Sequence, residues 1–143
     1  MLPQAKTMIP LCDNQVTAGE TATASFSRQD YDYAMIDVFL LGEETTDPPT
    51  VITLSEADGT TYANISGAVG GTDFTIPTEI ATVGDARHTI VSFGVDLRAR
   101  AKNIKLSVAA ATKTQVIETV KLFRGDTAPN TTTLAGNDLI VNL

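Results

Sequence analysis

The stretch from His88 to Val108 constrains the fold more than any other part of the chain. It holds two runs in which apolar and polar residues alternate, separated by a short polar connection. The apolar members of these runs are Val91, Phe93, Val95, Leu97, Ile104, Leu106 and Val108. Alternation with a period of two is typical of a strand with one buried face. The two strands form either a β-hairpin, which is the favoured reading, or an arch that joins strands in two facing sheets.

The connection between these runs carries three cations in five residues, Arg98, Arg100 and Lys102. Long cations often protect a hairpin end or a sheet edge against aggregation. They also build interfaces, because a planar guanidinium binds a carboxylate through two parallel hydrogen bonds. Both explanations stay open. Under the second, Arg98 or Arg100 pairs with carboxylates of an adjacent subunit.

Further alternating or strongly apolar runs predict more short strands, and no amphipathic helix is expected. The runs cover residues 5–11, 21–27, 33–41, 51–56, 115–123 and 138–143. Seven to nine short strands with turn signals between them predict an all-β fold. We expect a β-sandwich with a jelly-roll path rather than an immunoglobulin path, because the Cys and Trp signals of the latter are missing.

The length of 143 residues suits one ordinary domain, which we assign to residues 1–143. Residues 1–12 are expected to form an N-terminal arm or an edge strand, because prolines restrict their pairing. Residues 60–87 are rich in glycine and are expected to form an irregular excursion, with one or two short strands, packed on the sandwich like a flap. Residues 125–143 are expected to form an extended C-terminal tail with a last short strand.

The net charge of −7 hides an uneven distribution. Residues 29–86 contain eleven acidic residues and no Lys or Arg, whereas residues 87–124 contain eight cations and two acidic residues, which gives −11 and +6. Either facing strands complement each other within one domain, or acidic and basic faces meet between copies or on a larger assembly. Glu43, Glu44 and Asp47 in an acidic loop are the candidate interface residues on the acidic side. Nucleic acid is not expected as a partner, because the overall charge repels phosphate.

Residues that could perform chemistry are few. The chain has one histidine, His88, and one cysteine, Cys12, and nothing in the pattern brings them together as a nucleophile and base. No phosphate-binding or hydrolase motif is present, and one His with one Cys cannot close a zinc site. The acidic loop lacks the spacing of a calcium loop. No stretch approaches the roughly 20 apolar residues that span a bilayer. We therefore expect no enzyme, no cofactor, no metal and no membrane partner.

Four segments carry a resemblance to a known family. They are Leu2-Pro3-Gln4-Ala5-Lys6-Thr7, Tyr31-Asp32-Tyr33-Ala34-x-Ile36-Asp37-Val38, Gly70-Gly71-Thr72-Asp73-Phe74-x-Ile76-Pro77 and Phe93-x-Val95-Asp96-Leu97-Arg98-x-Arg100. Together they resemble a group of small head structural proteins encoded by tailed bacteriophages and prophages, with a role as capsid cement or decoration proteins. Family members typically read Leu-Arg-Gly-Arg, whereas Ala99 stands here in place of the glycine, which implies a reshaped turn.

The resemblance implies a jelly-roll β-sandwich that assembles as a homotrimer on the outside of a phage head. Its partners would be other copies of itself and the major capsid protein, and it would reside in the virion after synthesis in the bacterial cytoplasm. Residues up to 11 and from 125 onward are expected to reach neighbouring subunits. Two other functions stay open. One is a tail- or fibre-associated carbohydrate-binding module with a groove lined by Tyr31, Tyr33 or Tyr62, and the other is a head–tail connector component with ring symmetry.

Overall fold

The structure is a computed structural model, and it describes residues 6–28, 30–42, 50–76, 82–83, 86–109, 114–124 and 139–143. Within these residues the chain forms ten strands and no helix, which confirms the expected all-β class. The strands are β1 (Lys6–Val16), β2 (Thr21–Ser27), β3 (Tyr33–Gly42), β4 (Val51–Ala57), β5 (Ala63–Val69), β6 (Thr82–Val83), β7 (Ala86–Asp96), β8 (Asn103–Ala109), β9 (Thr114–Phe123) and β10 (Leu139–Asn142). A helix able to cross a membrane is not found in this part of the chain.

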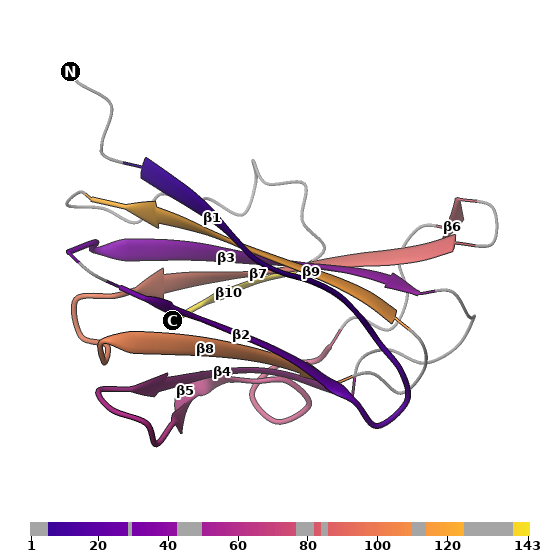
Figure 1. Ribbon diagram of the computed structural model, residues 1–143, viewed down its shortest axis with the longest axis horizontal. Helices are drawn as coiled ribbons and strands as arrows, with labels where there is room; N and C mark the ends of the chain where they lie inside the picture. The colour runs from indigo at the N-terminus through magenta and orange to yellow at the C-terminus, as the bar shows by residue number, and fades with distance from the viewer. Residues whose placement is uncertain are drawn as a thin grey trace.

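The strands form two sheets that lie face to face (Figure 1). Sheet A has the order β1-β9-β3-β7-β10, with β6 paired to β7, and sheet B has the order β2-β8-β4-β5. The pairs β1–β9, β2–β8, β3–β7 and β4–β5 are antiparallel, and each pair encloses the next along the chain. A long antiparallel hairpin rolled up in this way is a jelly roll, so the predicted jelly-roll sandwich is confirmed.

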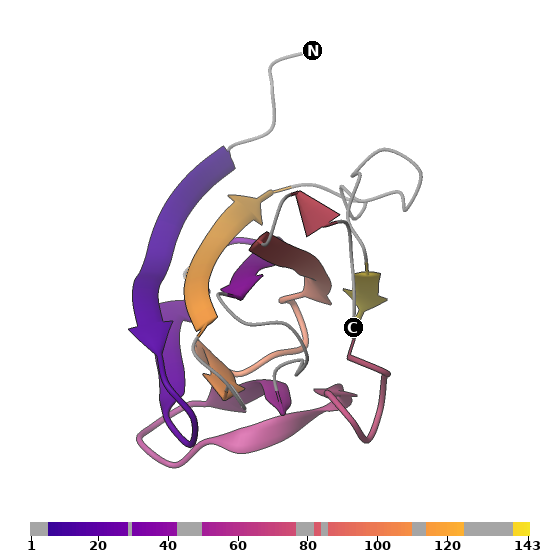
Figure 2. The same cartoon turned by 90° about the vertical axis from the view of Figure 1, so that its right-hand side faces the viewer.

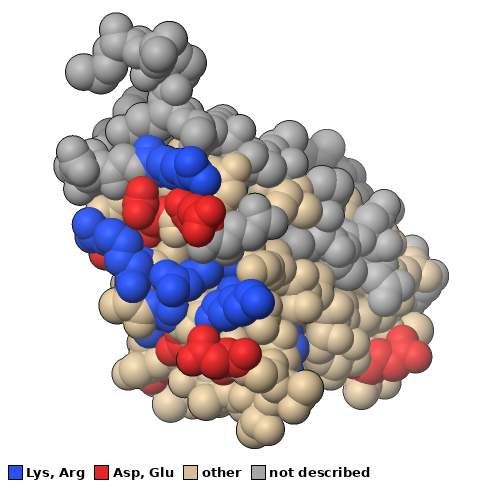
Figure 3. Space-filling model, turned by 60° about the vertical axis from the view of Figure 1, so that its left-hand side comes forward, with Lys and Arg blue, Asp and Glu red and all other residues tan. Residues whose placement is uncertain are grey.

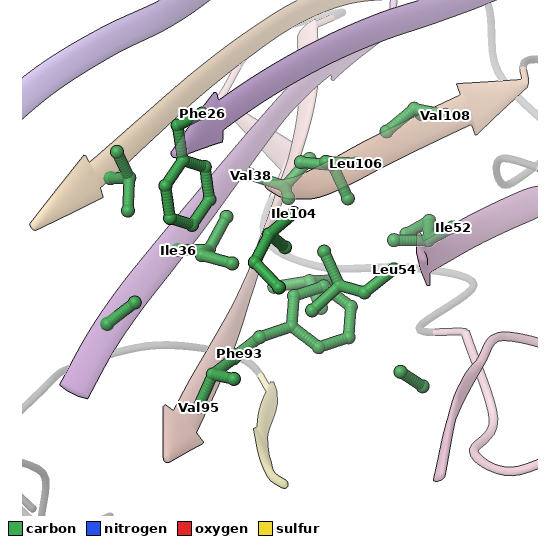
Figure 4. Close-up of a cluster of buried hydrophobic side chains, with 14 of the residues drawn as sticks. Phe26, Ile36, Val38, Ile52, Leu54, Phe93, Val95, Ile104, Leu106 and Val108 are labelled. Carbon is green, nitrogen blue, oxygen red and sulfur yellow. The ribbon is translucent and has the colours of Figure 1, made fainter. Parts of the chain in front are cut away.

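The core lies between the sheets because the sequence alternation turns every second residue inward. In β8 and β9 the buried and part-buried positions alternate along the whole strand. Side chains from both sheets meet in the close-up of Figure 4. Those labelled there are Phe26, Ile36, Val38, Ile52, Leu54, Phe93, Val95, Ile104, Leu106 and Val108. Phe93 also meets the ring of Phe74 edge-on, with ring centroids 5.7 Å apart. Full burial of each large apolar side chain contributes about 1.5–3 kcal/mol to stability.

The central stretch of the sequence forms an arch, and the favoured hairpin interpretation is wrong. β7 pairs with β3 in sheet A, whereas β8 pairs with β2 and β4 in sheet B. Residues 97–102, which we call the arch, therefore cross from one sheet to the other (left side of Figure 1). Alternating residues in a hairpin and in an arch both point into a core. For that reason the alternation predicted the two strands but did not decide how they pair.

The segments expected to be least regular take definite places in the sheets. Residues 63–69 form β5, which is an edge strand of sheet B rather than a separate flap, and its pairing with β4 is interrupted between Thr53 and Ser55. Residues 6–16 form β1 at one edge of sheet A. Of the C-terminal tail the structure describes residues 139–143, and β10 pairs in parallel with β7. Figure 2 shows β10 on the side of the sandwich opposite β1.

Candidate interface at the arch

The first half of the arch is fixed to sheet A and to the β2–β3 corner through Leu97. This side chain is fully buried in the core. Its N–H donates to the carbonyl of Asp32 at 2.7 Å. Its carbonyl accepts from the Arg28 guanidinium at 2.7 Å and from the Arg100 N–H at 3.1 Å, which closes a tight turn. The turn residues therefore have a defined backbone geometry.

The second half of the arch is held by two acidic residues from the end of β4. A carboxylate oxygen of Glu56 accepts from the Ala101 N–H at 2.8 Å, and a carboxylate oxygen of Asp58 accepts from the Lys102 N–H at 2.9 Å. The Arg28 N–H donates to the Lys102 carbonyl at 2.9 Å. Hydrogen bonds to charged groups are stronger than neutral ones, so these contacts hold the second half of the arch firmly against sheet B.

Arg98 is the arch cation that is both exposed and held in one orientation. Its Nε donates to Oδ1 of Asp96 at 2.9 Å and its Nη2 to Oδ2 at 2.5 Å, which makes a bidentate pair. The guanidinium carbon lies 4.9 Å from the centre of the Tyr33 ring. The side chain nevertheless stays 53% exposed. The hydrogen bonds with Arg98 hold the pKa of Asp96 below its usual range and raise the pKa of Arg98 itself.

The other two cations of the arch differ from Arg98. Arg100 is only 23% exposed and lies 3.6 Å from a carboxylate oxygen of Glu56, so it is largely occupied within the chain. Its buried Nε has no hydrogen-bond partner among the residues that the structure describes. Lys102 is exposed. The three predicted cations therefore lie together at one end of the sandwich. Arg98 and Lys102 face solvent, whereas Arg100 contacts Glu56 within the chain.

Some of the acidic and basic residues that the sequence separates form ion pairs with each other within one copy of the chain. Among the described residues, three ion pairs join the acidic segment to the basic segment. They are Glu56–Arg100 at 3.6 Å, Asp37–Lys121 at 2.5 Å and Asp30–Arg124 at 4.0 Å. Figure 3 shows the resulting surface, on which Lys and Arg side chains gather and acidic side chains lie among them. For these residues the explanation by complementary neighbours within one domain holds.

The acidic residues Glu43, Glu44 and Asp47 lie outside the described residues. The strands that flank their loop end far from the arch, because Gly42 of β3 pairs with Arg87 at the start of β7. Gly42 is nine residue steps along the extended strand from Tyr33 at the arch end, which corresponds to about 30 Å. The two ends of the loop are thus at the opposite end of the sandwich from the arch.

The three tyrosines are each covered by a cation. Arg98 lies over Tyr33, Lys105 over Tyr62 at 4.4 Å, and Arg124 over Tyr31 at 5.2 Å. Tyr33 is also buried. A sugar-binding platform needs an open aromatic face, so this arrangement lends no support to the groove expected for a carbohydrate-binding module.

Sequence reasoning did not single out several residues that shape this site. Asp96 could have been found, because it lies two positions before Arg98. Glu56 and Asp58 had no such signal, because they reach the arch only through the pairing of β4 with β8. Among the described residues there is no group of three or more potential metal ligands.

Glu118 was also missed, and it is the most unusual ionisable residue in the described part of the chain. It faces the core from β9, between Val116 and Val120, and is fully buried. Neither of its carboxyl oxygens has a hydrogen-bond partner there. Burial raises the pKa of Glu118 to about 7, because the charged form loses its hydration. The alternation of β9 alone would have placed it inside.

We compared the chain with protein-family models, with curated proteins and with solved structures, and none of them matches. The geometry of the arch and the four sequence segments are therefore the observations that bear on function.

Proposed function

We propose that this chain is a virion structural protein that decorates the outside of a tailed-phage head and cements the shell. Its partners in this proposal are the major capsid protein and other copies of itself in a homotrimer. It acts by binding, without a cofactor and without catalysis. The four sequence segments suggest the family, and the observation that carries the proposal is the exposed, prearranged Arg98 on a rigid arch.

The geometry of Arg98 suits a repeated interface. Ordering a long side chain on binding typically costs about 0.5–1.5 kcal/mol. Asp96 and Tyr33 already restrict Arg98 in the free protein, so less of this cost remains when a partner carboxylate arrives. A guanidinium has five N–H donors, and two of them go to Asp96. A partner carboxylate can therefore use the others.

A single exposed ion pair contributes at most about 1 kcal/mol, so one such contact would not hold a protein on a shell. A capsid presents the same surface many times, and a trimer would offer three arches to it. Linked weak sites then bind much more tightly than one site. Because a cement binds the assembled lattice and not the separated subunits, its binding stabilises the lattice by mass action.

The direct test adds the purified protein to heads that lack it and measures bound copies after sedimentation. The Arg98→Glu variant should bind at least tenfold more weakly than the wild type. Lys105→Glu, which makes the same charge change on β8 away from the arch, should bind within about twofold of the wild type. Failure of the wild type to bind heads, or equal binding by a normally folded Arg98→Glu, would contradict the proposal.

A further inference from the structure

The last strand, β10, is attached differently from the strands of the jelly roll. The eight strands from β1 to β5 and from β7 to β9 form the nested antiparallel pairs. β10 comes after a connection of fourteen residues, 125–138, and lies parallel to β7. It belongs to none of the nested pairs. The jelly roll is therefore complete without it.

β10 and Leu143 nevertheless bind at a specific site formed by β7 and Gly67, which we call the seat. The Leu143 N–H donates to the carbonyl of Gly94 at 2.8 Å, and the Asp96 N–H donates to the carbonyl of Leu143 at 3.0 Å. Val141 and Leu143 pack against the hydrophobic core. A Cβ placed on Gly67 of β5 would lie 3.1 Å from Cδ2 of Leu143, so the glycine leaves room for this side chain. The segment thus bridges the two sheets on one side of the sandwich (Figure 2).

The connection to β10 is a crossover between two parallel strands, β9 and β10, and its extended length exceeds the straight-line distance between their ends. The register places Phe123 level with Asp96 across β3, and Leu139 level with Val91. The offset is about 17 Å along the strands and about 14 Å across three strand spacings, or roughly 22 Å in all. Fifteen steps from Arg124 to Leu139 can reach roughly 50 Å when extended. A connection of this length can therefore also reach a neighbouring molecule whose seat lies within that distance.

We propose that β10 is exchanged between copies of this chain, so that the strand of one copy fills the seat formed by β7 and Gly67 of the next. The partner is a second copy of this chain, because the site beside β7 and Gly67 is shaped to fit β10 and Leu143 of this same sequence. The exchanged strand makes the same hydrogen bonds and core contacts as in a closed monomer, so exchange costs little and links the copies. The inference concerns self-association only, and it does not require that the partner shell be a phage head.

The seat is also connected to the arch. Asp96 donates its N–H to Leu143 and uses its carboxylate to hold Arg98. A strand that enters from a neighbour therefore ends beside the residue that orients Arg98. Loss of the strand should loosen the arch as well as the association of copies.

A disulfide between β10 and β7 tests where the strand comes from. Asn142 and Gly94 are partners in the register, so Asn142→Cys with Gly94→Cys is the variant pair, in a Cys12→Ser background. After oxidation, exchange predicts covalently linked chains on a non-reducing gel, at a multiple of the chain mass. Chains that are linked only within themselves would overturn the proposal. The Gly94→Cys variant alone is the control for unspecific crosslinking.

A second variant keeps the test decisive if the two cysteines disturb folding. Removal of residues 139–143 should leave a β-rich fold by circular dichroism but reduce the mass in light scattering to that of a monomer. A truncated protein with the oligomeric mass of the wild type would contradict exchange. A double-cysteine variant that is linked only within its own chain yet still binds heads would overturn exchange and leave the proposed decoration function intact.

Discussion

Asp96 grips the guanidinium of Arg98 from two positions earlier in the chain, with Nε–Oδ1 at 2.9 Å and Nη2–Oδ2 at 2.5 Å. The two residues lie where β7 leaves sheet A and the arch begins. Pairs this close in sequence form wherever the backbone turns, but here the Tyr33 ring supports the guanidinium as well. Arg98 is therefore exposed without being free to move through all its rotamers.

Removing the Asp96 carboxylate should weaken binding to heads without destabilising the fold. In Asp96→Ala, Arg98 keeps its charge but loses its fixed orientation, so a partner must order it on binding. We expect binding to heads to weaken about three- to tenfold, which is less than the effect of Arg98→Glu. Sedimentation with heads measures this, and the thermal unfolding midpoint should stay close to that of the wild type. Asp96→Ala with undiminished binding would show that prearrangement contributes nothing.

Glu56 should matter for stability rather than for binding. Its carboxylate accepts from the Ala101 N–H and lies beside Arg100, so Glu56→Ala leaves a part-buried cation and an N–H without these partners. The expected loss is about 1–3 kcal/mol in the free energy of unfolding. Urea denaturation measures it. Asp30→Ala is the matched control, because Asp30 is 93% exposed and its pair with Arg124 is 4.0 Å long.

The same contact explains why charge reversal should be confined to Arg98. Reversal at both Arg98 and Arg100 would change the charge of the arch more strongly than reversal at Arg98 alone. Arg100→Glu would place a second carboxylate beside Glu56 and lower stability, which would confuse a binding assay. We expect the double variant to unfold at a lower urea concentration than Arg98→Glu alone. Equal midpoints would show that Arg100 does not support the arch.

Glu118 should make stability depend on pH. Its pKa is about 7 in the folded protein, above the ordinary value of 4.5 expected after unfolding. Between these values the folded state keeps a proton that the unfolded state has lost. The free energy of unfolding should therefore fall as pH rises from about 4.5 to about 7, by an amount on the order of 3 kcal/mol. This stabilisation is fully present below pH 4.5 and is lost above pH 7.

Glu118→Gln tests this directly, because the amide cannot ionise. Urea denaturation at pH 5 and pH 8 should show a smaller difference for this variant than for the wild type, and the variant should be the more stable of the two at pH 8. Asp30→Asn is the control, because the Asp30 side chain is 93% exposed, and it should keep the pH dependence of the wild type. An identical pH dependence for Glu118→Gln and the wild type would rule out this role.

Gly70 should tolerate no larger residue. A Cβ there would lie 2.8 Å from Cγ1 of Ile76 and 3.0 Å from the Ile52 carbonyl oxygen. Gly70→Ala should therefore cost about 1–3 kcal/mol through overpacking. Gly59→Ala is its control, because no heavy atom lies within 4 Å of the Cβ position there and its φ is not positive. Chemical denaturation of the two variants should separate them clearly, and equal midpoints would contradict the packing around β5.

The oligomeric mass of the free protein, measured at different salt concentrations, shows what joins its copies. Light scattering should show a trimer at low salt. Association through exposed arch charges predicts that the trimer loosens as salt rises from about 0.05 to 1 M, whereas association through an exchanged β10 predicts a mass that salt does not change. A monomer at every salt concentration would contradict self-association of the free protein, and a large ring would favour a head–tail connector.

Sequence patterns predicted the strands well, because burial of one face of a strand requires an apolar residue at every second position. Val91 and Phe93 alternate with polar residues, and both are buried. The pattern could not reveal that β7 and β8 belong to different sheets, because an inward residue has the same neighbours in sequence either way. β5 was the least visible strand. Its buried residues, Ile65 and Ala68, are three positions apart, so the strand lacks an apolar residue at every second position.

The candidate site was predictable only in part for a similar reason. The cations of the arch occupy three of five successive positions, 98 to 102, so their clustering followed from any turn at that point. Their partners were not visible, because Glu56 meets Arg100 only after β4 pairs with β8. The exposure that distinguishes Arg98 from Arg100 likewise depends on the fold.

The location of the protein in the particle tests the central claim most directly. A cryo-electron-microscopy reconstruction of heads that carry this chain should show β-sandwich density on the outer surface of the shell, in groups of three, with the arch end against a neighbouring molecule. Arg98 should lie within hydrogen-bonding distance of a carboxylate of that neighbour. Density in a ring at the head–tail vertex, or particles without this protein on the shell, would contradict the account.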